Sequence, residues 1–108
     1  MTNQELDAAV ATDVMGWEIK HSLVGSYYAE VGDETNKCQA RCFQWHPTTD
    51  TRDTERVIAK LQDGCRVTIY FHHAGGNVNI FREGYEVGYG NDPDWKRAVC
   101  LAAINAVS

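Results

Sequence analysis

The sequence predicts an α+β fold in which a mainly antiparallel sheet is layered with three helices, an α/β sandwich. Three observations predict it. Apolar residues recur at helical spacing in three segments, at the start, in the middle and at the end of the chain. Runs of alternating apolar and polar residues, rich in β-branched and aromatic side chains, lie between them. The connections are short and contain turn residues, so neighbouring strands are expected to form antiparallel hairpins.

The first helix is predicted over residues 3–14. Thr2 and Glu5 have the spacing of a capping box, in which each side chain bonds to the other residue's backbone amide. Gly16 is expected to end the helix. An extended segment over residues 17–20 follows it.

Two strands and a second helix are predicted next. The strands, 26–31 and 38–45, form a hairpin across a polar turn at 32–36. The helix is expected to begin at a cap formed by Thr49 or Asp50 and to end at Gly64, in a left-handed conformation.

Three further strands are predicted in the second half, at residues 65–72, 78–83 and 85–89. The segment 74–77 is typical of a hairpin turn. The glycines of segment 88–92 are interpreted as a tight turn before the last helix.

The last helix is predicted to be the most buried element. Asp92 is expected to cap it, and Pro93 fits its first position, where no amide donor is needed. Between Ala98 and Val107 only Asn105 is polar. A helix that is apolar most of the way round is buried on several sides. Its many alanines also allow another backbone to approach closely.

These elements give the order α-β-β-α-β-β-β-α in a single domain over residues 1–108, because 108 residues form one core. A net charge of −5 argues against general affinity for nucleic acid. No apolar run approaches the ~20 residues that span a bilayer, and no signal peptide is recognised. A cytosolic protein with reduced cysteines is therefore expected.

No metal site, catalytic residue or cofactor is predicted. Cys38 and Cys42 would lie ~13 Å apart on one strand, too far to share a zinc ion. His72 near Glu83 or Glu86 across a hairpin would make an acid/base pair, but polar residues on the open face of a sheet give the same pattern.

The better-supported prediction is a binding surface on the sheet. Tyrosine and tryptophan combine an apolar body with a polar tip, which suits base stacking or anchoring of a partner, and nearby arginines can meet a phosphate. The candidate ligand-binding residues are Tyr28, Arg41, Trp45, Arg66, Tyr70, His72, Arg82 and Tyr85.

Three segments together resemble the phage ABA sandwich domain, a family of small bacteriophage proteins named for an α/β/α arrangement. They are Val14-Met15-Gly16-Trp17, Trp45-His46-Pro47-Thr48-Thr49-Asp50 and Ala98-Val99-Cys100-Leu101-Ala102-Ala103. The resemblance implies a phage or prophage protein that acts inside the host cell. It implies no activity and no functional residue.

The expected function is that of a non-enzymatic phage binding protein in the host cytoplasm. The hypothesis is that it counters antiviral defence, either by sequestering a linear or cyclic nucleotide signal or by blocking a host protein. The alternatives are a small enzyme acting on a nucleotide and a phage regulatory or interaction protein. A homodimer is expected, because Ala-rich helix surface and exposed sheet edges both favour pairing.

Overall fold

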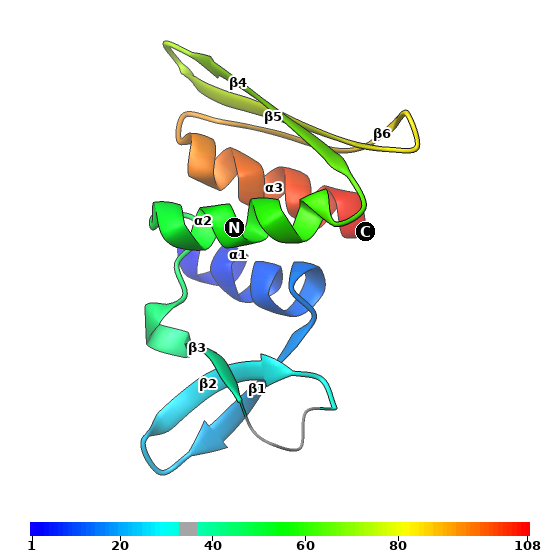
Figure 1. The fold of residues 1–108 in the computed structure, drawn as a ribbon. Coiled ribbons are helices and arrows are strands. Elements are labelled where there is room, and N and C mark those ends of the chain that lie inside the picture. Colours follow the sequence, from blue (N-terminus) through cyan, green and yellow to red (C-terminus); the bar gives the residue numbers. More distant parts are fainter. Residues whose placement is uncertain (33–36) are drawn as a thin grey trace.

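Two antiparallel sheets enclose the helices of this chain (Figure 1). The structure is a computed structural model, and it describes residues 1–32 and 37–108. The helical elements are α1 (Asn3–Ala9), the π-helical η1 (Val10–Val14), the 3₁₀-helical η2 (Cys42–Gln44), α2 (Thr51–Gln62) and α3 (Trp95–Val107). The strands are β1 (Trp17–Ser22), β2 (Gly25–Glu30), β3 (Cys38–Arg41), β4 (Arg66–His72), β5 (Gly75–Arg82) and β6 (Tyr85–Asp92).

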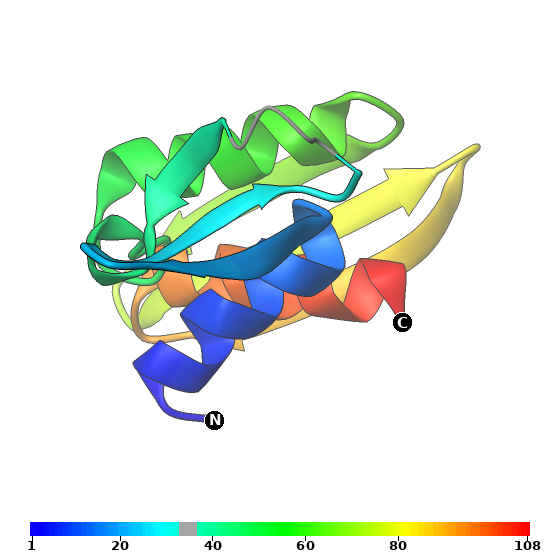
Figure 2. The same cartoon turned by 90° about the horizontal axis from the view of Figure 1, so that it is seen from below.

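The α+β class and the antiparallel hairpins are confirmed, but the strands form two separate sheets. Each has three strands, in the orders β1-β2-β3 and β4-β5-β6. The helices stand between them, so that each sheet has one face toward the helices (Figures 1 and 2). The extended segment after η1 is a complete strand of the first sheet, paired with β2 from Trp17↔Glu30 to Ser22↔Gly25.

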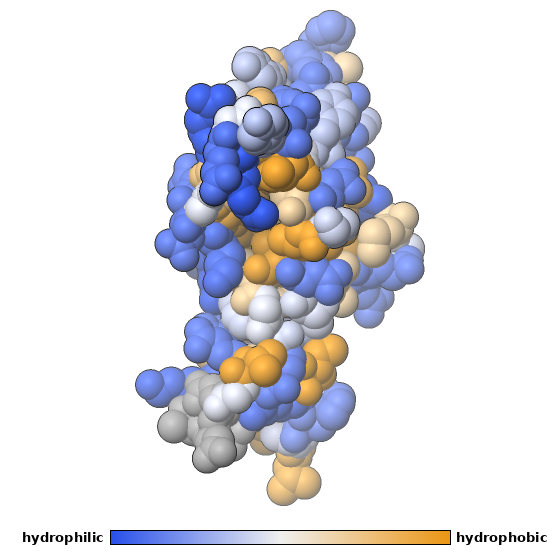
Figure 3. All heavy atoms as spheres, turned by 90° about the vertical axis from the view of Figure 1, so that its right-hand side faces the viewer, coloured by the Kyte–Doolittle hydropathy of each residue, from blue (hydrophilic) through white to orange (hydrophobic). Residues whose placement is uncertain are grey.

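Helix α3 is the centre of the core, as predicted. It packs against β5 and β6 on one side and against α1, η1 and α2 on the other. Six of its residues are buried: Ala98, Val99, Cys100, Ala102, Ala103 and Ala106. Figure 3 shows one flank of the molecule, where apolar side chains gather at the level of the helices and recur over the first sheet.

The cap of α3 differs from the prediction. Asp94 caps it by accepting a hydrogen bond from the Lys96 amide at 2.9 Å. Asp92 instead ends β6, and its carboxylate accepts from the Asp94 amide. Pro93 therefore lies between strand and helix. The prediction failed because Asp-Pro-Asp offers two acids with the same capping chemistry.

The glycines of β6 were wrongly interpreted as a turn. Gly88 and Gly90 are buried strand residues that face α3. Their missing side chains let the helix lie directly on the sheet. The small residues of α3 meet them there, which confirms that its alanines allow close approach of another backbone.

Several boundaries need correction. The strand predicted over 38–45 ends at Arg41, so Cys42 and Trp45 lie beyond it. Gly64 does not have a positive φ, whereas Gly16 does, at 73°. The capping box of Thr2 and Glu5 and the Asp50 cap of α2 are confirmed. Of the turn predicted at 32–36, residues 33–36 lie outside the described residues.

Candidate functional site

The structure divides the predicted binding residues between the two sheets. Tyr28 and Trp45 lie on the first sheet's side, both buried, and Arg41 is on β3, its guanidinium 5.9 Å from the Tyr27 ring centre. The remaining five residues belong to the second sheet. The predicted surface is therefore two regions: a hollow beside β1 and β2, and the outward face of β4–β6.

The hollow is a cavity of about 710 Å³ between α1, the inner side of β1 and β2, and the loop that leads into α2. Small-ligand sites are typically of this size, with mainly apolar walls and a few fixed polar groups. Its lining residues are Asn3, Gln4, Asp7, Ala8, Ile19, His21, Ser26, Tyr28, Cys42, Phe43, Trp45, His46, Thr48 and Thr49.

Asp7 is the charged group of the hollow. Its side chain is 9% exposed, and its Oδ1 accepts a hydrogen bond from the Thr48 amide at 3.0 Å. Its backbone carbonyl accepts from the Trp45 indole at 3.0 Å. These bonds fix the 45–48 loop against α1. Burial raises the pKa of Asp7 above its ordinary value, although the Thr48 amide and His46 lower it in part.

Thr48 places a buried hydroxyl that lacks a hydrogen-bond partner beside Asp7. The residue is 1% exposed. Its Oγ1 lies near enough to Asp7 to help lower the pKa of that carboxyl, yet it has no hydrogen-bond partner of good geometry. Among the described residues it is the one buried side-chain polar atom in that condition. An unpaired buried hydroxyl is costly, and a ligand atom could satisfy it.

The histidines of the hollow are held by the protein. In His46, Nε2 lies 2.7 Å from the Phe43 carbonyl oxygen, and Nδ1 lies 3.6 Å from Asp7 Oδ2. In His21, Nδ1 lies 2.7 Å from Ser26 Oγ. Both ring nitrogens of His46 are thus engaged. The arrangement favours fixed hydrogen-bonding groups over a mobile general base.

The remaining wall is aromatic and carries a thiol. Tyr28 and Trp45 flank Trp17, with ring centres 6.1 Å and 4.7 Å from it. Phe43 stands at the hollow 67% exposed. Burial raises the pKa of the Cys42 thiol, with Tyr28 as its hydrogen-bonding neighbour. A thiol with a raised pKa is a poor nucleophile at neutral pH, so the hollow suits binding better than catalysis.

The charge of the hollow limits its ligands. Its lining residues include one carboxylate and no lysine or arginine. A phosphate inside it would meet the Asp7 carboxylate without a lysine ammonium or an arginine guanidinium to balance it. The hollow therefore favours uncharged or cationic groups, with a flat body against the aromatic rings and a donor toward Asp7.

The open face is the outward side of β4–β6. Val78 and Ile80 are fully buried, so the alternate residues of β5 and the partners opposite them face away from the helices. The residues of this face are Arg66, Thr68, Tyr70, His72, Asn77, Asn79, Phe81, Glu86, Tyr89 and Asn91. The Arg66 guanidinium lies 4.9 Å from the centre of the Phe81 ring, and Tyr70 is 59% exposed. Arg82 and Tyr85 pair beside the β5–β6 turn, outside this group.

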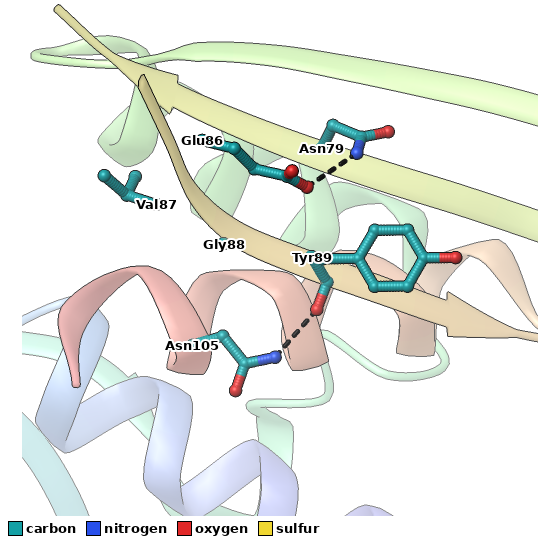
Figure 4. A pocket seen from close by; sticks show the side chains of 6 residues that line it. All are labelled: Asn79, Glu86, Val87, Gly88, Tyr89 and Asn105. Carbon is teal, nitrogen blue, oxygen red and sulfur yellow. Dashed lines mark hydrogen bonds between the residues drawn. The ribbon is translucent and has the colours of Figure 1, made fainter.

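A shallow depression of about 490 Å³ lies at the β6 edge of the second sheet (Figure 4). Its amides are already bonded: Asn79 donates to Glu86 at 2.8 Å, and Asn105 donates to the Tyr89 carbonyl at 2.7 Å. The dashed lines of Figure 4 show both bonds. This depression offers a ligand few unsatisfied groups.

The proposed acid/base pair of the second sheet is not formed. His72 is opposite Gly75, whereas Glu86 is opposite Phe81, six residues further along β5. That separation corresponds to ~20 Å at strand rise. His72 Nε2 lies 3.3 Å from Asn77 Oδ1 instead. The described residues contain no cluster of three or more metal-ligating side chains, and all four cysteines are free thiols.

Sequence reasoning missed Asp7, Thr48 and His46. The signal for Asp7 was its place beside Leu6 on the helix face that also carries Val10, since a carboxylate on an inward face is unusual. Thr48 and His46 gave no signal of their own, because the loop before α2 was interpreted only as a helix entry.

Comparison with known proteins agrees with this architecture. The fold places this chain in a class of small phage proteins that are built as α+β sandwiches. The family model of the phage ABA sandwich domain matches residues 8–104, so the chain belongs to that family. A phage protein from Bacillus cereus ATCC 14579, solved as a 2.0 Å crystal structure, has the same fold: TM-score 0.64, 18% identity, covering 99% of this chain and 93% of that one. A comparison with curated proteins gives no match. No helix of the described residues is long and apolar enough to cross a membrane.

Proposed function

We propose that this phage protein is a non-enzymatic binding protein and that its ligand occupies the hollow beside β1 and β2. One observation carries the proposal. The 710 Å³ hollow joins aromatic walls to a buried carboxylate and a buried hydroxyl that lacks a good partner. Buried polar groups are normally satisfied, so an incompletely satisfied group in a concave site favours a missing ligand.

The ligand class follows from the wall chemistry. A planar heterocycle would stack on the exposed ring of Phe43, in front of the buried rings of Tyr28 and Trp45, donate to the Asp7 carboxylate and bond to the Thr48 hydroxyl. A nucleotide fits only with its base inside and its phosphate outside, because no lysine or arginine lines the hollow. A nucleoside should therefore bind about as tightly as its phosphorylated form.

The biological role that we propose is interference with host antiviral defence. A phage protein in the host cytoplasm that holds a base-bearing signal would lower the free concentration of that signal. Family membership supports the phage origin, and the hollow supports capture of a small molecule. The sequestered signal can be a linear or a cyclic nucleotide.

The test is native mass spectrometry of the purified chain with a panel of nucleosides and of linear and cyclic nucleotides. The proposal predicts a mass shift equal to one unmodified ligand. Asp7→Asn and Thr48→Val should weaken the complex at least tenfold, which is about 1.4 kcal/mol. Tyr70→Ser, on the open face, is the matched control and should bind normally.

Each other result has a definite meaning. A shift to the mass of a reaction product would overturn the non-enzymatic assignment in favour of an enzyme acting on nucleotides. No shift with any ligand would remove the small-molecule proposal. Loss of binding in Tyr70→Ser, with normal binding in Asp7→Asn and Thr48→Val, would move the site to the second sheet.

A second candidate function is the blocking of a host protein by the open face. Tyr70 and Tyr89 are 59% and 46% exposed there, and Arg66 stacks on Phe81. Tyrosine and arginine are enriched in protein interfaces. Crosslinking in infected cells tests it: a host protein captured by wild type and lost in Tyr70→Ser would support it, whereas unchanged capture would count against this face.

A further inference from the structure

Strand β1 is a free edge of the first sheet, and the register shows which of its backbone groups point outward. The loop between β1 and β2 has two residues, Leu23 and Val24, so Ser22 and Gly25 close the hairpin as a hydrogen-bonded pair. Hydrogen-bonded pairs alternate along an antiparallel ladder. The amides and carbonyls of Trp17, Ile19 and His21 therefore point away from β2.

The side chains of β1 are self-complementary about Ile19. Glu18 precedes it and Lys20 follows it, on the side of the strand away from the helices, and within one chain Lys20 Nζ lies 3.6 Å from Glu18 Oε1. In an antiparallel pairing of two β1 strands centred on Ile19, each Glu18 lies opposite the other copy's Lys20. Trp17 then lies opposite the second copy's His21, so every outward backbone group of these residues meets a donor or an acceptor.

We infer that two copies of this chain pair through their β1 edges, in the register centred on Ile19. Two such sheets form one continuous six-stranded sheet, and the two faces that line the hollows become contiguous. Ile19 is 47% exposed and lines the hollow, so this pairing brings the second copy's Ile19 beside it at the edge of the hollow. The second copy thus contributes a side chain to the edge of the site.

Neighbouring registers are less favourable. A pairing centred on Glu18 puts two carboxylates face to face, and one centred on Lys20 does the same with two ammonium groups. Like charges directly opposite each other destabilise a strand pair. Of the three registers, only the one centred on Ile19 both pairs the outward backbone groups of Trp17, Ile19 and His21 and places unlike charges opposite each other.

The hairpin tip supports the same register. Leu23 is fully exposed and Val24 is 77% exposed, although two-residue turns normally carry polar or small residues. In this pairing the tip extends past the second copy's Gly16 toward its Met15, a partly buried side chain at the end of η1. An apolar tip then meets an apolar neighbour.

A charge-swap series tests the contact by multi-angle light scattering, with no ligand present. The wild-type chain should be a dimer. Glu18→Lys and Lys20→Glu should each raise the dimer dissociation constant at least about tenfold, because each places like charges opposite at two symmetric positions. The double variant Glu18→Lys with Lys20→Glu should restore the dimer, and an equimolar mixture of the single variants should form heterodimers.

Ile19→Pro supplies a second variant that does not depend on charge. It removes an amide that points away from β2, so the hairpin should persist while the dimer is lost, and Ile19→Val should behave as wild type. A monomeric wild type would overturn the inference. So would a dimer that survives all these changes, or a double variant that stays monomeric. Light scattering measures dimerisation without ligand, and native mass spectrometry measures ligand binding on its own, so failure of the dimer and failure of the ligand site are distinguishable.

Discussion

Gly90 of β6 lies against Ala98 of α3 so closely that a Cβ at position 90 would stand 2.1 Å from the Ala98 carbonyl oxygen. At Gly88 the corresponding distance to the Ala102 carbonyl is 2.4 Å. The two glycines are two residues apart in β6, and the two alanines are four residues apart in α3. Together they set the spacing between the second sheet and the central helix. The core depends on the absence of side chains there.

Replacing Gly90 with alanine should lower the free energy of unfolding by about 3 kcal/mol, because neither the strand nor the helix backbone can yield without disturbing the core. Urea unfolding followed by circular dichroism measures it. Gly64→Ala is the control. It has open space and should change stability by less than about 0.5 kcal/mol. Equal effects of the two variants would contradict this packing.

Asp7 should make stability fall as pH rises. Its folded pKa is raised, so the folded chain holds this proton more tightly than the unfolded chain does. The favourable contribution is complete below the unfolded value and is lost as pH rises through the folded value. Denaturation of wild type and Asp7→Asn between about pH 3 and about pH 7 should show wild type losing stability relative to the variant. A constant difference would refute the assignment.

The four thiols should differ in reactivity. Cys100 is fully buried, and burial raises its pKa to about 12, whereas Cys38 is exposed. With an aromatic disulfide reagent at about pH 8, Cys38 should react in the fast phase and Cys100 only on unfolding. Cys38→Ala should remove the fast phase and Cys100→Ala should not. Rapid labelling of Cys100 in the folded chain would be inconsistent with this core.

Arg56 ties α2 to the aromatic wall. Its guanidinium lies 5.0 Å from the ring centre of Trp17 and 5.3 Å from that of Trp45. Arg56→Met keeps most of the stem but removes the cation, and should cost about 1–2 kcal/mol of stability. Thermal unfolding checks it against Arg52→Met. The Arg52 side chain is 89% exposed, and its loss should cost less than about 0.5 kcal/mol. Two equal losses would argue against a cation–π contribution.

Local sequence patterns predicted most elements of the fold but not their division into two sheets. The buried nature of α3 followed from its composition, and the hairpins followed from short polar turns. Whether β3 pairs with β4 in one sheet depends on contacts between residues far apart in the sequence. The alternation of apolar and polar residues within each strand does not predict those contacts. Gly88 and Gly90 were misinterpreted because a turn and a close helix contact both need a residue without a side chain.

The site was harder to predict than the fold. Tyr28 and Trp45 were identified as candidates from residue type alone, and both line the hollow. Asp7 and Thr48 were not, because their importance depends on a hydrogen bond between residues 41 positions apart in the sequence. Tyr70 and Arg66 shared the same residue-type signal, but they face outward from the other sheet.

The most direct test of the central claim is a two-dimensional ¹H–¹⁵N NMR titration of the wild-type chain with the nucleoside or nucleotide that binds best. Two reporters lie at the hollow: the Thr48 amide and the Trp45 indole N–H, both bonded to Asp7. Ligand binding in the hollow should shift these two signals strongly and leave the amides of Tyr70 and Tyr89 unchanged. Shifts confined to the second sheet, or none at saturating ligand, would rule out binding in the hollow.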